Sequence, residues 1–101
     1  MKNYEGALVY YQQALRGKEK VPEKTHPDTL MTIEGMGDVY KKIKNFTKAE
    51  GMYRLALDGY DMSLGKDHRL TKNCAFNLAS MLRDQGRQDD FQKLRKAYPH
   101  I

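Results

Sequence analysis

The sequence predicts an all-α protein, a helical-repeat solenoid in which about five helices pack as antiparallel pairs. Three observations predict it: the chain matches itself at a shift of 42 residues, the matched apolar residues recur at helical spacing, and strand signals are missing. We expect residues 1–101 to be one array, with half a repeat at 3–25, a full repeat at 26–66 and a final repeat at 67–101.

The self-match runs without a gap from Asn3 to Thr71. Aromatic, small and turn residues all fall on counterparts of similar size, which chance would hardly supply so consistently. The pairs are Asn3 and Asn45, Tyr4 and Phe46, Ala7 and Ala49, Tyr11 and Tyr53, Ala14 and Ala56, Leu15 and Leu57, Gly17 and Gly59, His26 and His68, and Thr29 and Thr71.

Helices are expected at about 4–20, 27–43, 46–63, 68–84 and 88–97, in two alternating types. One type, the B helix, has its apolar face at Ala7, Tyr11, Ala14 and Leu15, repeated at Ala49, Tyr53, Ala56 and Leu57. The other type, the A helix, has its apolar face at Ile33, Met36, Gly37, Tyr40 and Ile43, repeated at Ala75, Leu78, Ala79 and Leu82. Each repeat is therefore an A helix followed by a B helix.

Small residues on these faces indicate how a pair packs. Gly37 and Ala49 have almost no side chain, so two helix backbones can approach closely there, and Tyr40 and Tyr53 then fill the surrounding space. We interpret this aromatic stripe as protein core and expect no cofactor.

The turns between helices agree with the same boundaries. His26-Pro27-Asp28-Thr29 places a proline where a first helical turn tolerates it and an acid near the positive helix end. Residues 67–71 form the matching turn without the proline. Lys44-Asn45 and residues 85–87 separate the A helices from the B helices.

The last helix departs from the pattern. Phe91 stands where earlier repeats have alanine, and Arg95 stands where they have tyrosine. A bulky ring at a position of close approach is expected to disturb regular packing. Polar residues accompany it, so we predict that this helix caps the C-terminal end of the array.

Composition narrows the function classes. The net charge is +5, but the basic residues are scattered and form no ladder with aromatic residues, which argues against a dedicated nucleic-acid-binding role. A single cysteine, Cys74, excludes an internal disulfide and favours the cytoplasm, and we expect its thiol to be a small buried apolar group. No apolar stretch has the ~20 residues of a membrane span.

The sequence contains few residues in patterns typical of a catalytic site. His26 and His68 recur at the same turn, so their role is interpreted as structural and not as metal binding. Glu34 and Asp38 form a carboxylate pair, but nothing suggests a nucleophile or a phosphate loop beside them. We expect no enzyme activity, no metal and no cofactor.

The pattern of Ile33, Met36, Gly37 and Tyr40, followed by Ala49, Tyr53 and Ala56, resembles the tetratricopeptide repeat. The 42-residue period and the His-Pro-Asp-Thr-Leu turn resemble the kinesin-light-chain type of that repeat. The resemblance implies a protein-interaction scaffold that binds a peptide or a partner segment in a concave groove lined by the A helices.

Helical position assigns residues to that groove. We expect ten groove residues, which are Met31, Glu34, Asp38, Lys41, Lys42, Asn73, Phe76, Asn77, Ser80 and Arg83. The resemblance implies that an asparagine such as Asn77 holds the backbone of an extended peptide, whereas the corresponding position in the preceding repeat is Gly35. The charges are interpreted either as an ordinary solvated helix face or as a trough that is acidic at Glu34 and Asp38 and basic at the other end.

The first helix would lack an A-helix partner on one side. Its apolar face consists of Tyr4, Ala7, Leu8, Tyr11 and Ala14. Because a large exposed apolar face usually marks an interface or a missing piece, we expect either a fragment of a longer array or a homo-oligomer that covers this face.

Overall fold

The computed structural model of this chain describes residues 25–99 and 101. Those residues form four helices and no strand: α2 (Pro27–Lys42), α3 (Phe46–Leu64), α4 (Arg69–Asp84) and α5 (Gln88–Ala97). Each helix begins and ends within one residue of the predicted position. The fifth expected helix, at 4–20, lies outside the described residues, so the structure describes four helices instead of five.

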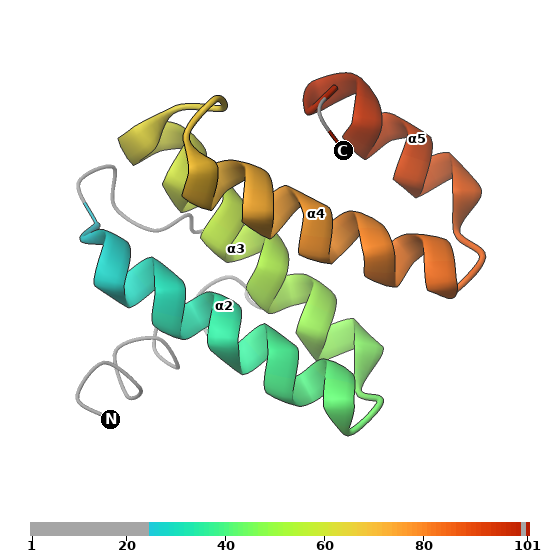
Figure 1. The fold of residues 1–101 in the computed structure, drawn as a ribbon. Helices are drawn as coiled ribbons and strands as arrows, with labels where there is room; N and C mark the ends of the chain where they lie inside the picture. The colour runs from blue at the N-terminus through green and yellow to red at the C-terminus, as the bar shows by residue number, and fades with distance from the viewer. Residues whose placement is uncertain (1–24, 100) are drawn as a thin grey trace.

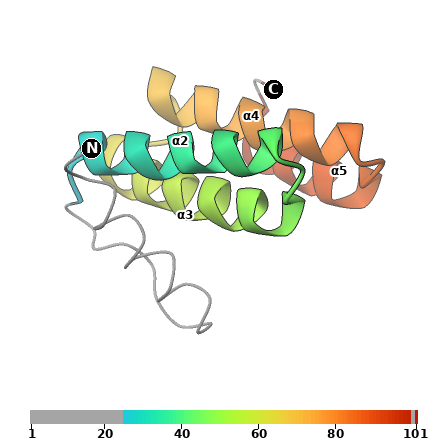
Figure 2. The same cartoon turned by 90° about the horizontal axis from the view of Figure 1, so that it is seen from below.

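Successive helices run in opposite directions (Figure 1), as expected for antiparallel pairs. α3 packs against both α2 and α4, and α4 also packs against α5. α2 and α3 lie one above the other along most of their length (Figure 2), with α3 between α2 and α4 in the order of contacts. The two A helices, α2 and α4, point the same way.

The two histidines open the A helices in the same manner. The backbone N–H of Asp28 donates to His26 Nδ1 over 3.0 Å, and the backbone N–H of Leu70 donates to His68 Nδ1 over 3.1 Å. Each imidazole thereby satisfies one of the unpaired N–H groups at a helix start. The recurrence of histidine at this turn is therefore explained by helix capping.

The turns that end the A helices also repeat. Lys44 and Gly86 are 42 residues apart and both adopt a left-handed backbone, with φ of 63° and 74°. In each turn the next N–H bonds back to a carbonyl five residues earlier, Asn45 to Tyr40 and Arg87 to Leu82, both at 2.9 Å. This hydrogen-bond pattern ends a helix with a residue in the left-handed conformation.

The core follows the predicted apolar faces, except that Tyr40 is only partly buried against it and Ile43 lies outside it. Ile33, Met36 and Gly37 of α2 are buried, and the copy on α4 is buried throughout. The tyrosine and the small residue of α3, Tyr53 and Ala49, are fully buried. Ile43 was wrongly placed in this core: it is the C-cap residue of α2 and is 65% exposed, because the helix ends one residue before it and the chain turns away.

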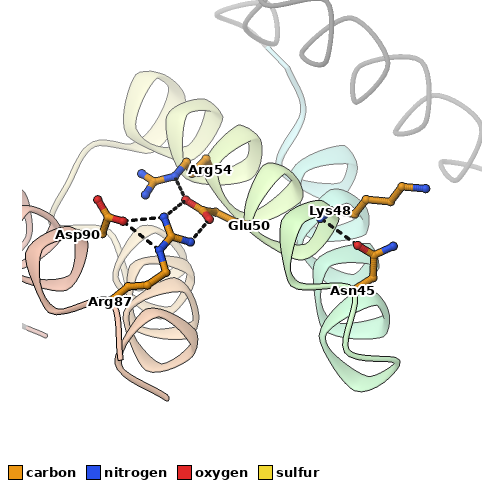
Figure 3. Close-up of polar contacts among 6 residues, drawn as sticks. All are labelled: Asn45, Lys48, Glu50, Arg54, Arg87 and Asp90. Carbon is orange, nitrogen blue, oxygen red and sulfur yellow. Dashed lines mark hydrogen bonds and ion pairs between the residues drawn. The ribbon is translucent and has the colours of Figure 1, made fainter. Parts of the chain in front are cut away.

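A charged cluster fastens α5 to α3 (Figure 3). The Arg87 guanidinium donates to both oxygens of Glu50 and, over 2.6 Å from Nη2, to Asp90 Oδ2, while Arg54 Nε donates to Glu50 Oε2 over 2.8 Å. Burial alone would raise the pKa of Glu50, but the hydrogen bonds from Arg87 and Arg54 outweigh it and hold the pKa below its usual 4.5. Figure 3 also shows Asn45, whose side-chain oxygen accepts from the backbone N–H of Lys48 at the start of α3.

The C-terminal helix is only partly buried. Leu94 and the following Tyr98 enter the core, and the Phe91 ring packs partly against it. The Tyr98 hydroxyl donates to Asp61 Oδ2 on α3 over 3.0 Å. The exposed residues of α5 are mainly polar, as a terminal cap requires, and its capping role in the array stays a prediction.

Candidate functional site

A hollow of about 400 Å³ lies between the two A helices. α2 and α4 each contribute residues spaced three and four apart, so one face of each helix lines it. The lining residues are Met31, Glu34, Gly35 and Asp38 from α2 and Leu70, Asn73, Phe76 and Asn77 from α4.

Glu34 joins three helices beneath this hollow. Its Oε1 accepts from the Tyr60 hydroxyl of α3 over 3.2 Å, and its Oε2 accepts from the Asn77 amide of α4 over 2.7 Å. Burial raises the pKa of Glu34 above its usual 4.5, the two hydrogen bonds oppose the rise, and the nearby negative charge of Asp38 adds to it. Neutral hydrogen-bond donors therefore hold the carboxylate in place, and no described basic side chain forms an ion pair with it.

Asp38 is anchored from below in the same way. Its Oδ1 accepts from the hydroxyl of Tyr53, whose ring is buried in the core. Burial, and then the hydrogen bond to Asp38, raises the pKa of the Tyr53 hydroxyl far above its usual value, so this group remains a proton donor. The floor of the hollow is thus a row of polar groups in fixed orientations.

Two large apolar side chains in the lining remain exposed. Met31 of α2 is 49% exposed and Phe76 of α4 is 56% exposed. They come from the two sides of the hollow, so an apolar rim of one side chain on each side flanks the polar floor. A few oriented polar groups beside apolar surface are typical of ligand-binding pockets in proteins.

A family comparison agrees with this architecture. The family model described as tetratricopeptide repeat matches the chain at residues 1–62 and again at residues 32–90. This chain belongs to the tetratricopeptide repeat family. A comparison with curated proteins and another with solved structures return no match.

The family assignment indicates what such repeats generally do. Tetratricopeptide repeats generally mediate protein–protein interactions, and they are generally scaffolds without enzyme activity. The resemblance derived from Ile33 to Ala56 is confirmed at the level of the family. In the described part of this tetratricopeptide repeat protein, no helix is both long and apolar enough to cross a bilayer.

The structure brings six of the ten predicted groove residues to the hollow: Met31, Glu34, Asp38, Asn73, Phe76 and Asn77. The other four, Lys41, Lys42, Ser80 and Arg83, do not line it. Arg83 lies at the C-terminal end of α4, where its Nε is 3.8 Å from the Asp84 carboxylate. The expected self-association face at residues 4–14 lies outside the described residues.

Sequence reasoning missed Leu70 and the tyrosine hydroxyls. Leu70 precedes Asn73 by three residues on the same face of α4, so its helical position was a usable signal. Tyr53 and Tyr60 were not predicted as partners of the groove carboxylates, because their rings belong to the core of a different helix.

Cys74 is part of the core beneath this surface and is fully buried. Its thiol lies 3.5 Å from the carbonyl oxygen of Tyr53. Burial raises the pKa of the thiol well above its usual range, so this group stays protonated. The cysteine therefore behaves as the small apolar core residue that the sequence predicted.

Proposed function

We propose that this tetratricopeptide repeat chain binds an extended segment of a partner protein in the hollow between α2 and α4. One observation carries the proposal: Met31 and Phe76 remain half exposed on opposite sides of a polar floor that is already held by hydrogen bonds. A partner that covers these side chains gains the free energy of burying them, about 1 kcal/mol for half of a large apolar side chain. The floor is already oriented, so little further ordering is needed.

Asn77 has a defined part in this proposal. One N–H of its amide donates to Glu34, which leaves the second N–H and the carbonyl oxygen of the same side chain for a peptide backbone. Asn73, one turn earlier on α4, is exposed and supplies a second amide. Asn77 thus supports a peptide-backbone contact in which its side chain both accepts and donates.

The finer classification is also a proposal. The capping histidines and the left-handed turns, each repeating after 42 residues, support a solenoid of the kinesin-light-chain type. The lone buried thiol supports a reducing compartment, and we propose the cytoplasm, which a fluorescent fusion of the full-length protein would check.

A displayed library of random twelve-residue peptides, selected on the immobilised full chain, tests the binding proposal. Selected peptides should bind wild type and lose about fivefold or more in affinity to Phe76→Ala. Met62→Ala is the matched control, because Met62 is also an exposed apolar side chain, 44% exposed on α3, and does not line the hollow. Equal binding to both variants would place the interaction elsewhere.

A second candidate is self-association, which one observation favours. Val39 is 54% exposed, whereas Met81, its counterpart 42 residues later, is buried. Val39 on α2 and Ile43 at its C-cap therefore leave apolar surface uncovered, in addition to the predicted face at Tyr4, Ala7, Leu8, Tyr11 and Ala14. Size-exclusion chromatography with light scattering decides this candidate, and a monomer at micromolar concentration would contradict it.

A further inference from the structure

Two carboxylates of the hollow have no cationic partner among residues 25–99 and 101. Glu34 and Asp38 stand one turn apart on the same face of α2, and no described residue forms an ion pair with either. Elsewhere on the described surface, Glu50, Asp61 and Asp90 each lie within 3 Å of a basic group. In a chain with a net charge of +5, the hollow is a place where negative charge is left uncompensated.

The hydrogen bonds on these carboxylates show which oxygen remains open. Both oxygens of Glu34 accept from neutral groups, Tyr60 and Asn77. On Asp38 only Oδ1 accepts, from Tyr53, and Oδ2 receives no hydrogen bond from the described residues. Like charges one turn apart repel each other, so a cation between them would relieve that repulsion as well as fill the open acceptor.

The exposed apolar side chains of the hollow indicate what else the bound group should contain. Lysine and arginine carry their charge at the end of an aliphatic stem, and such stems pack along apolar surface while the charged end reaches a polar group. Met31 and Phe76 provide that surface on the two sides of the carboxylates. Phe76 is an exposed aromatic residue, a guanidinium is attracted to the face of an aromatic ring, and arginine is more weakly hydrated than lysine.

We propose that the hollow receives a basic side chain of the partner segment, arginine in preference to lysine, with its charge at Asp38 Oδ2 and Glu34 and its stem between Met31 and Phe76. This inference rests on the proposed function, because it names the chemistry of the segment that the hollow binds. It predicts that the partner is a basic and apolar sequence, although the protein itself is basic overall.

The library selection above also tests this inference. Selected peptides should be enriched in arginine or lysine beside an apolar residue. Replacing that basic residue by glutamine should weaken binding about tenfold, and raising the salt concentration should weaken the parent peptide further. Asp38→Asn should cause a similar loss in the protein, since asparagine still accepts from Tyr53 but carries no charge.

Asp89→Asn is the matched control, because Asp89 is an exposed acid at the start of α5 and is not part of the hollow. The affinity of this variant for the selected peptides should equal that of wild type within about twofold. The glutamine peptide should lose little more when tested on Asp38→Asn, which would show that the two groups act on each other.

The outcomes separate the two proposals. Selected peptides that are neutral or acidic, yet depend on Phe76, would overturn the basic-side-chain inference and keep the groove function. An absence of binders, or binders indifferent to Phe76, would overturn both. Far-ultraviolet circular dichroism of each variant confirms that its helices are intact.

Discussion

Gly37 of α2 lies directly against the ring of Tyr53 on α3. A Cβ atom at Gly37 would be 2.9 Å from both Cδ1 and Cε1 of that ring, which is closer than van der Waals contact allows. The ring is fully buried, and its hydroxyl is held by Asp38, so it has little freedom to withdraw. The next repeat has Ala79 at the glycine position and the exposed Arg95 at the tyrosine position, so an alanine fits where the ring is absent.

Gly37→Ala is therefore expected to destabilise the protein. Overpacking against Tyr53 costs about 1–3 kcal/mol, and the better helix propensity of alanine recovers about 1 kcal/mol. The expected net loss in the free energy of unfolding is up to about 2 kcal/mol, measured by urea denaturation.

Gly35→Ala is the matched control on the same helix. Apart from the adjacent residues and the backbone of its own helix, nothing lies within 4 Å of a Cβ atom at Gly35, so this variant should gain about 0.5–1 kcal/mol of stability. Equal stabilities of the two variants would show that the Tyr53 ring moves aside easily, against the packing described here.

Lys44→Gly is expected to stabilise the protein by up to about 1 kcal/mol. Lys44 has φ of 63°, a conformation that costs most side chains free energy and glycine none. Its side chain is exposed, so its loss removes no core contact. Thermal unfolding at several scan rates measures the effect.

Gly86→Ala is the converse substitution in the later repeat. This variant should lose about 1 kcal/mol of unfolding free energy, because φ of 74° itself disfavours alanine. Beyond the two adjacent residues, nothing lies within 4 Å of the added methyl group, so a clash is not the cause. If both substitutions leave stability unchanged, the left-handed turns are not the source of strain at these positions.

Glu34→Gln should change how stability depends on pH. The pKa of Glu34 is raised on folding, so the native state binds this proton more tightly than the unfolded state does. The free energy of unfolding therefore falls as the pH rises from the pKa of the unfolded state, near 4.5, through the pKa of the folded state. At higher pH it stays at the lower level. The glutamine variant lacks this penalty, so its advantage over wild type should be absent below about pH 4 and present at pH 7. Urea titrations at pH 3.5, 5, 6 and 7 test this, and an advantage that shrinks as the pH rises would contradict it.

Arg87→Ala should loosen α5. Its guanidinium is partly exposed, so the loss is expected to be modest, about 0.5–1 kcal/mol, and smaller in high salt. Hydrogen exchange of the α5 amides should become faster, while exchange in α2 should change little. Lys93→Ala provides a control on the same helix, since Lys93 is exposed and forms no ion pair in the described structure.

Glu50→Gln should show the opposite pH signature to Glu34→Gln. The pKa of Glu50 is lowered on folding, so its contribution to stability is present above the unfolded value of 4.5 and is lost as the pH falls through the folded pKa. Wild type should exceed the variant in stability at pH 7, and the difference should disappear in acid. A difference that persists at pH 2 would assign the effect to packing and not to charge.

Local chemistry was enough to place the four helices that the structure describes. Capping residues, the proline in the first turn of α2 and the three- and four-residue spacing of apolar residues act within about one or two turns of the chain, so they are readable in the sequence. The same local geometry placed six residues on the two facing helix surfaces, because the direction of a side chain around a helix follows from its position. It failed at Ile43, where the apolar spacing continues but the helix does not.

The contacts that shape the site depended on how the helices pack. Tyr60 and Asn77 reach Glu34 from positions 26 and 43 residues away, and Arg87 reaches Glu50 across 37 residues. Whether such groups meet depends on the crossing of whole helices, which is set by the summed packing of Gly37, Tyr53 and their neighbours. The repeat and the faces of its helices could therefore be predicted from the sequence. The oriented carboxylates of the hollow could not, because they form only where three helices pack together.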